Sequence, residues 1–138
     1  FIDGNLNITS GTFISLKLSG DSAAVYIVKG NINLDTYVQD LQGVFIARKS
    51  FNDCSFAVNN CNATTNAYML KVKGALYVDA LHVAGEEPGK MNLQRYYNPT
   101  AFGNILYPSD QFTYDPKYLV MLSNLLASAE VGWKEVNP

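Results

Sequence analysis

Two aspartates in this chain have the type and position that chemistry requires. Asp35 and Asp79 occupy the same ninth place in two copies of a repeated phrase, so stacked copies would bring their carboxylates together. Such a pair either binds a shared cation or works as an acid pair, as in polysaccharide-cleaving enzymes. The alternative is that each aspartate makes turn hydrogen bonds after its strand. We favour the turn.

A catalytic triad or dyad needs a histidine to move the proton, and His82 is the only histidine in the chain. It alternates with Leu81 and Val83, so we expect it on the solvent face of a strand. The sequence also lacks the glycine-rich nucleotide motifs and the His-Glu-x-x-His zinc motif. We therefore predict no catalytic residue, no metal site and no cofactor, and so no enzyme.

The two cysteines, Cys54 and Cys61, lie in a stretch rich in Asn, Ser and Thr, where we expect a loop at residues 51–66. An oxidising compartment would join them, and no second cysteine pair or nearby histidine completes a zinc site. We predict a Cys54–Cys61 disulfide. Asn7 and Asn62 each begin a glycosylation sequon and are candidate glycosylation sites.

One nine-residue phrase, repeated three times, supplies the strands that would position these residues. The copies begin at Phe1, Ile27 and Lys71, with glycine in fourth place and apolar residues in second, sixth and eighth. This alternation predicts a strand with one buried face, and the glycine marks a bend or a close backbone approach. A recurring strand unit indicates stacked coils. We predict an all-β, irregular parallel β-solenoid in which the three phrases are neighbouring rungs.

The alternative architecture is a β-sandwich, which also has many short strands with glycine-marked turns. Hairpin signals between adjacent strands are nearly absent, which favours the solenoid. The phrases start 26 and then 44 residues apart, so we expect the longer gap to hold an insertion. We expect one domain over 1–138, with strand coils in 1–84 and an irregular aromatic segment and helix in 85–138.

The clearest helix signal lies at residues 116–129, with Asp115 as the N-cap and Pro116 in the first helical position. Its apolar stripe predicts packing across the end or flank of the strands as a cap. The aromatic side chains of residues 96–118 belong either to the core beneath this helix or to a stacking platform for sugars. We favour the core.

The composition excludes several classes of protein. Hydrophobic residues make up 48% of the chain and charged residues 16%, with a net charge of -2, so global disorder and nucleic-acid binding are not expected. No apolar stretch reaches the roughly 18 residues that a membrane-spanning helix needs. The chain opens inside a repeated phrase, so we expect it to be a piece of a longer protein.

Six segments carry a resemblance to known sequences: Ile27–Leu34, Leu41–Ala47, Leu70–Ala75, Asn92–Tyr96, Tyr114–Tyr118 and Trp133–Val136. Together they resemble the C-terminal part of uncharacterised predicted surface proteins of candidate-phyla bacteria. The Gly-Asn-Ile phrase more distantly resembles bactofilin-type polymer-forming solenoids, from which this chain departs in its unequal repeats, cysteine loop and helix. The resemblance implies a surface protein and brings no catalytic residues with it.

We therefore expect an extracellular or cell-surface domain with a structural or adhesive role. Its partners would be other copies or other surface proteins, and residues 1–9 are the expected self-association edge. The alternative is a polysaccharide-binding or polysaccharide-cleaving module, with Lys29, Lys73 and Tyr77 as candidate sugar contacts.

Overall fold

The computed structural model describes residues 1–9, the backbone of 14–16, and residues 22–54, 69–80, 82–95, 109–118, 120 and 123. These residues contain the strands β1 (Leu6–Ile8), β2 (Ile14–Leu16), β3 (Val25–Val28), β4 (Ile32–Leu34), β5 (Val38–Ala47), β6 (Phe51–Asn52), β7 (Leu70–Tyr77), β8 (Met91–Asn92) and β9 (Asp110–Thr113). Every strand pair among them is parallel. The predicted all-β parallel architecture is confirmed, and the antiparallel sandwich is wrong.

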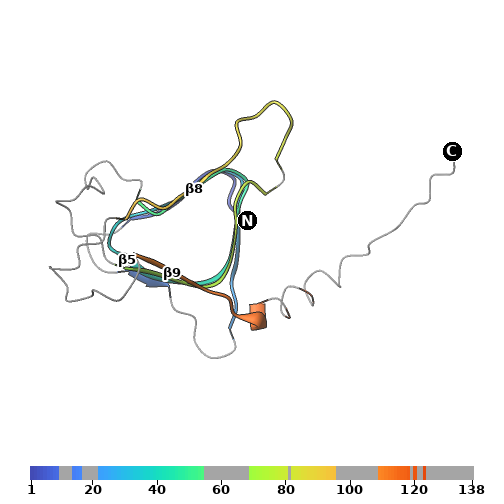
Figure 1. Cartoon of the computed structure of the whole chain (residues 1–138). Helices are drawn as coiled ribbons and strands as arrows, with labels where there is room; N and C mark the ends of the chain where they lie inside the picture. The colour runs from blue at the N-terminus through green and yellow to red at the C-terminus, as the bar shows by residue number, and fades with distance from the viewer. Residues whose placement is uncertain are drawn as a thin grey trace.

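The strands form two sheets that the chain visits alternately. One sheet has the order β1-β4-β6-β8, and the other has β2-β5-β7-β9, with β3 also paired to β5. Each circuit of the chain adds a strand to both sheets, and seen end-on the circuits trace a triangle (Figure 1). We call β1-β4-β6-β8 the first side and β2 with the N-terminal halves of β5 and β7, plus β9, the second side. The third side consists of β3 with the C-terminal halves of β5 and β7.

The core lies inside the triangle and is built in columns that run across the circuits. Ile32 and Leu34 of β4 are fully buried, whereas Asn33 between them is not, as the period-2 alternation of a strand requires. On the third side, the Tyr26 and Phe45 rings stack with centroids 4.8 Å apart. The buried hydrophobic cluster is Ile8, Val28, Ile32, Leu34, Val38, Leu41, Phe45, Ala47, Phe51, Leu70 and Val72.

The repeated phrase predicts the packing of two copies correctly and of the third incorrectly. Leu6 pairs with Ile32 and Ile8 with Leu34, so the first two copies are neighbouring rungs. The third copy stacks on β5, with Gly74 beside Gly43, and so Leu76 lies in a different sheet from Ile32. The reason is that glycines turn two different corners of the triangle, and the phrase does not distinguish one corner from the other.

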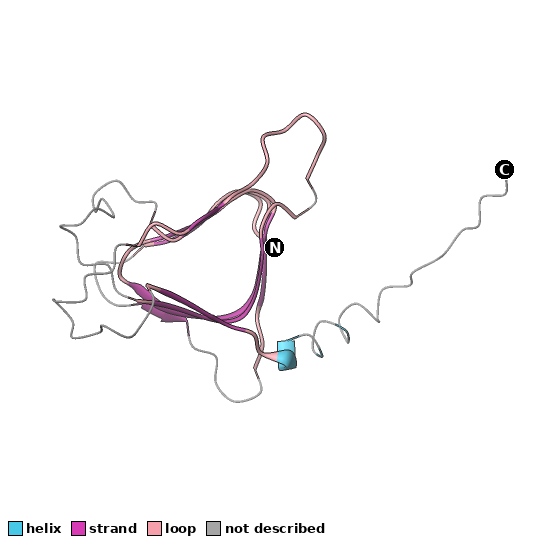
Figure 2. Ribbon diagram, viewed as in Figure 1, coloured by secondary structure: helices cyan, strands magenta, loops and turns pink. Residues whose placement is uncertain are grey.

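The strands β5 and β7 bend at the corner between the second and third sides (Figure 2). Gly43 and Gly74 are paired at this corner, since β5 pairs with β2 up to Leu41 and with β3 from Val44. Their φ angles are 134° and 140°, a region that L side chains rarely adopt. A Cβ on Gly43 would lie 2.7 Å from the carbonyl oxygen of Ala24, and a Cβ on Gly74 would overlap the carbonyl of Gly43. Only glycine lets the backbones of successive circuits approach this closely.

Both sheets continue past residue 84, where the sequence placed the end of the strand coils. Strand β8 pairs with β6, and β9 pairs with β7. The sequence does not predict β8 and β9, because both strands are short and neither lies in a copy of the repeated phrase. Strand β6 likewise occupies residues 51 and 52, which the sequence assigned to the cysteine loop.

The expected helix begins where the sequence places it. Asp115 accepts a hydrogen bond from the N–H of Lys117 at 3.1 Å, and Pro116 is helical, which confirms the N-terminal signal. The Tyr118 side chain is buried. Most of residues 119–129 lie outside the described part of the chain, so the capping role of this helix stays a prediction.

Candidate functional site

A ladder of asparagine side chains runs along the outer face of the first side. Asn33 donates from Nδ2 to Asn7 Oδ1 at 2.8 Å, Asn52 to Asn33 at 2.7 Å, and Asn92 to Asn52 at 2.6 Å. Each asparagine occupies the outward position of its strand, and the strands are in register. All the amides donate toward the N-terminal circuit, so the ladder has a direction.

A second polar ladder runs along the corner where the third side meets the first. The backbone N–H of Asn31 donates to Asn5 Oδ1 at 2.8 Å, that of Ser50 to Asn31 Oδ1 at 3.0 Å, and that of Lys90 to Ser50 Oγ at 2.9 Å. This ladder stops at Lys90, because an ammonium group has no acceptor to offer the next circuit. The side chains thus satisfy backbone donors that the corner would otherwise leave unpaired.

The corner between the first and second sides holds a buried charge pair. The side chains of Asp53 and Arg95 are both 0% exposed, and Nε of Arg95 lies 4.0 Å from Asp53 Oδ2. The guanidinium donates mainly to backbone, with Val38 O at 2.7 Å, Asp35 O at 3.0 Å and Thr36 O at 3.3 Å. The Arg95 side chain therefore links the corner between the first and second sides to the same corner of earlier circuits.

The Asp53 carboxylate also forms hydrogen bonds with the backbone. It accepts the backbone N–H of Gln94 at 2.7 Å and that of Arg95 at 3.2 Å. Burial raises the pKa of Asp53 from 3.8 to about 6, because its effect and the charge of Asp110 outweigh the lowering effects of the Gln94 N–H and the Arg95 charge. Burial also lowers the pKa of Arg95. The contacts of this pair hold the fold together, and no local sequence pattern predicts them.

The two aspartates proposed as a cation or acid pair lie at different corners. Asp35 follows β4, and its Oδ1 accepts the Thr36 hydroxyl at 3.0 Å and the Tyr37 N–H at 3.3 Å. Asp79 follows β7 with φ of 60°, and its Oδ1 accepts the Gly89 N–H at 2.9 Å, which lowers the pKa of Asp79. These contacts support the turn role for both residues.

His82 lies on an exposed loop, because β7 ends at Tyr77 before the strand that the sequence predicts. Its Nδ1 is 3.1 Å from Asp79 Oδ1, with an exposed side-chain fraction of 40%. The His82–Asp79 contact resembles part of a triad. However, the described hydroxyl and thiol contacts include none to this histidine, so the pair has no nucleophile in the described part of the chain.

Several candidate residues cannot be placed in full. Asn7 is exposed and carries the first ladder, whereas Asn62 lies outside the described residues, so glycosylation stays a prediction. Cys54 directly follows the buried Asp53, and Cys61 is outside the described residues, so the disulfide also stays a prediction. Of the aromatic segment, Tyr118 is buried as expected, while Phe112 is 43% and Tyr114 58% exposed.

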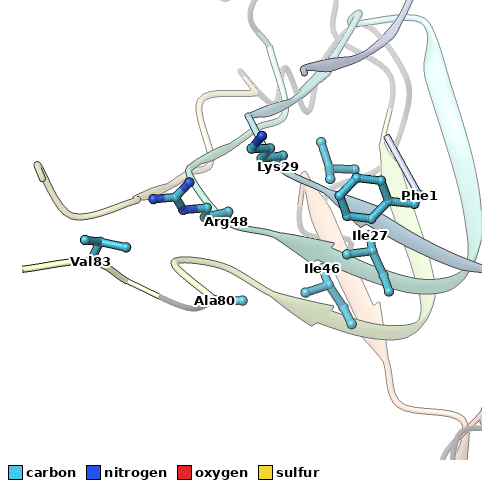
Figure 3. A pocket seen from close by; sticks show the side chains of 8 residues that line it. Phe1, Ile27, Lys29, Ile46, Arg48, Ala80 and Val83 are labelled. Atoms are coloured by element: carbon cyan, nitrogen blue, oxygen red, sulfur yellow. The ribbon is translucent and has the colours of Figure 1, made fainter. Parts of the chain in front are cut away.

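An open apolar pocket of about 390 Å³ lies on the third side. Figure 3 shows Phe1, Ile27 and Ile46 gathered at one end, with Lys29 and Arg48 toward the other. Both cations are already paired, Lys29 with Asp3 at 2.9 Å and Arg48 with Glu86 at 3.0 Å. Its described lining is therefore mainly apolar, and the two charged side chains in that lining are already engaged with carboxylates.

A smaller polar pocket, of about 170 Å³, lies on the second side. Its outward residues form two rows, one with Lys71 between Asp40 and Gln111 and one with Lys73 between Gln42 and Thr113. Lys73 also lies 3.4 Å from the carboxylate of Asp115. Of the three suggested sugar contacts, only Lys73 lines this pocket, because Tyr77 pairs with Ile46 on the third side and Lys29 pairs with Asp3. The three residues therefore do not form one row.

Comparisons with known proteins give no family for this chain. No family model matches it, and neither curated proteins nor solved structures yield a match. Among the residues that the structure describes, no group of three or more His, Cys, Asp or Glu is placed to hold a metal. No helix in that same part is long and apolar enough to cross a membrane.

Proposed function

We propose that this chain is a rigid β-solenoid segment with a structural or adhesive role in an extracellular or cell-surface protein. The observation that carries the proposal is the register of the circuits: the same columns of buried side chains and the same outward asparagines recur from β1 to β8. Because each circuit repeats the cross-section of the one before, the fold extends along one axis. Such a shape suits a spacer or a fibre subunit.

The polar chemistry of the described residues supports the same role. The asparagine amides bond to one another, the Arg95 guanidinium bonds to backbone, and both aspartates in repeated positions make turn contacts. These groups use their hydrogen bonds to hold the circuits together. This use supports a non-catalytic role, and we propose other copies or other surface proteins as the partners.

Small-angle scattering combined with negative-stain electron microscopy tests this proposal. A rod of uniform cross-section that forms ordered filaments or lattices as concentration rises supports it. A spherical particle that stays monomeric contradicts it. Addition of a crude polysaccharide mixture should leave both the scattering profile and the reducing-sugar content unchanged.

A polysaccharide-binding or polysaccharide-cleaving module is the second candidate. The polar rows of the second side favour it, since Lys71 and Gln111 lie side by side on an outward face as sugar hydroxyls would require. A glycan array decides this point with the wild type and the Lys71→Ala, Gln111→Ala double variant. Selective binding that the double variant loses would establish the module.

A further inference from the structure

The loop between β7 and β8 forms a recess with the corner where the third side meets the first. Residues 82–89 of this loop project from that corner (Figure 1). Asn31, Lys49 and Ser50 line the recess from the corner, and residues 86–89 line it from the loop, around a volume of about 320 Å³. It shares no lining residue with the two pockets described above.

Two sets of contacts fix this loop to the corner, so the recess is preformed. The guanidinium of Arg48 donates to both carboxylate oxygens of Glu86 at 3.0 Å. The N–H of Gly89 donates to Asp79 Oδ1 at 2.9 Å, and a Cβ on Gly89 would overlap the carbonyl of Lys49. Glycine therefore lets the end of the loop lie directly against the corner backbone. A site whose walls are already held in place loses little freedom when a ligand binds.

The corner supplies hydrogen-bond donors to the recess, because the second ladder uses only the oxygens of its side chains. Asn31 Oδ1 accepts the N–H of Ser50 at 3.0 Å, and Ser50 Oγ accepts that of Lys90 at 2.9 Å. A side-chain amide has two N–H donors and a hydroxyl has one. None of these side-chain donors is hydrogen-bonded to a residue that the structure describes. The fold thus leaves the donors of Asn31 and Ser50 available to a ligand.

The recess also contains two charged side chains of opposite sign. Within the described part of the chain, the Lys49 ammonium and the Glu87 carboxylate form no ion pair with each other or with any other group. Glu86, by contrast, is paired with Arg48. Glu87 would repel a purely anionic ligand, and Lys49 would repel a purely cationic one. A ligand with one group of each sign satisfies both residues.

From this arrangement we infer that the recess binds a free amino acid, a small ligand that carries both a carboxylate and an ammonium group. The ligand carboxylate accepts hydrogen bonds from Lys49, Asn31 and Ser50. The ligand ammonium group donates to Glu87, so that the bonds at both charged groups are charge-assisted. Binding in this recess requires neither a second copy nor an elongated shape, so it does not depend on the proposed structural role.

An NMR titration of the full chain with glycine and with β-alanine tests the inference. These two amino acids differ in the separation of their charged groups, whereas acetate and methylammonium each present only one of the two charges. We expect at least one amino acid to shift the amide signals of Ser50 and Gly89 in a saturable way. It should bind about tenfold or more tightly than acetate or methylammonium, because each of these makes only one set of charge-assisted bonds.

Two charge-removing variants locate the binding. Lys49→Met and Glu87→Gln alter exposed side chains, so both proteins should keep the thermal stability of the wild type. Each should bind the amino acid about tenfold more weakly, because one charge-assisted set of bonds is lost. Lys71→Met is the matched control, since Lys71 is an exposed lysine on the second side, and it should bind like the wild type.

Three results would overturn the inference: no saturable shift with either amino acid, wild-type affinity in Lys49→Met or in Glu87→Gln, or acetate binding as tight as that of the amino acids. The last result would show a site for anions alone. A protein that binds an amino acid but is spherical and monomeric would support this inference and contradict the structural role, so the two proposals can fail separately.

Discussion

The corners of the triangle are turned in two contrasting ways. At the corner of Gly43 and Gly74, the chain bends by removing side chains, so that backbone packs directly on backbone. At the corner of Asp53 and Arg95, it bends around two buried, charged side chains that hydrogen-bond to backbone. The first corner depends on steric fit, and the second depends on satisfying buried polar groups.

This difference determines what each corner tolerates. The glycine corner has no space for an added side chain. Its two glycines bring no polar side chain that would need a hydrogen-bond partner. The Arg95 corner has large side chains, and its guanidinium bonds to residues 57 and 60 positions earlier, so that one change leaves several groups unsatisfied. Substitutions at the two corners should therefore differ in how much stability they remove.

Gly74→Val should prevent stable folding. The new side chain would overlap the Gly43 carbonyl and would also take up a φ of 140°, so we expect a loss of more than about 4 kcal/mol in the free energy of unfolding. Urea denaturation followed by circular dichroism measures it. Gly85→Ala is the control, because Gly85 has a φ of 92° and open space around it, and it should cost only about 1 kcal/mol. Equal effects of the two changes would refute the steric account.

Arg95→Met should cost about 3 to 5 kcal/mol, because it leaves four backbone carbonyls without their donor and removes the charge 4.0 Å from the buried Asp53 carboxylate. The matched control is Arg48→Met, which removes the partly exposed pair with Glu86 and should cost less than about 1 kcal/mol. Chemical denaturation of both variants gives the comparison. If Arg95→Met is as stable as Arg48→Met, the buried corner contributes no more than a surface ion pair.

Asp53 should make stability fall as pH rises from about 4 to about 6. The folded state keeps the proton up to about pH 6, whereas the unfolded carboxyl loses it near 3.8, so the folded state binds more protons in this window. The effect is at most about 3 kcal/mol, and Asp53→Asn should remove this part of the pH dependence. A pH series of thermal unfolding for both proteins tests it. An unchanged slope in the variant would show that other groups cause the dependence.

Asn33→Ala should cost about 1 to 2 kcal/mol, because Asn33 both donates and accepts in the ladder. Asn7→Ala removes one bond and should cost about half as much. Thermal unfolding of the two variants, compared with the double variant, measures the coupling between the residues. Identical losses for Asn33→Ala and Asn7→Ala would mean that the ladder bonds are not additive along the sheet.

The sequence revealed the glycine bends at Gly4, Gly30 and Gly74 because each lies within a copy of one short phrase, whereas Gly43 lies outside the phrase. Alternating apolar residues after a glycine predicted the strands and the buried faces correctly at Leu6 and Ile32. The same phrase could not say that Gly74 stacks on Gly43, since both kinds of corner need glycine for the same steric reason. The prediction that the third copy continues the sheet of the first two was therefore wrong.

The charged corner and the ladders were hidden for a different reason. Asp53 and Arg95 are 42 residues apart, and nothing in either local sequence marks them as partners. The asparagines do lie at corresponding outward positions, and Asn7 and Asn33 could have been matched from the first two phrases. Asn52 and Asn92 lie in strands of two residues, where no periodicity can develop.

The strand ends at one corner line up from circuit to circuit. Asn52 and Asn92 are paired neighbours where the first side ends, and Leu70 and Asp110 are paired neighbours where the second side starts. Beyond the buried corner residues Asp53 and Arg95, a connecting segment only has to span a fixed gap between two anchored points, and doubling its length costs only about 0.6 kcal/mol of closure entropy. Peptides of widely different length and composition can therefore be grafted along this one edge without altering the scaffold that displays them.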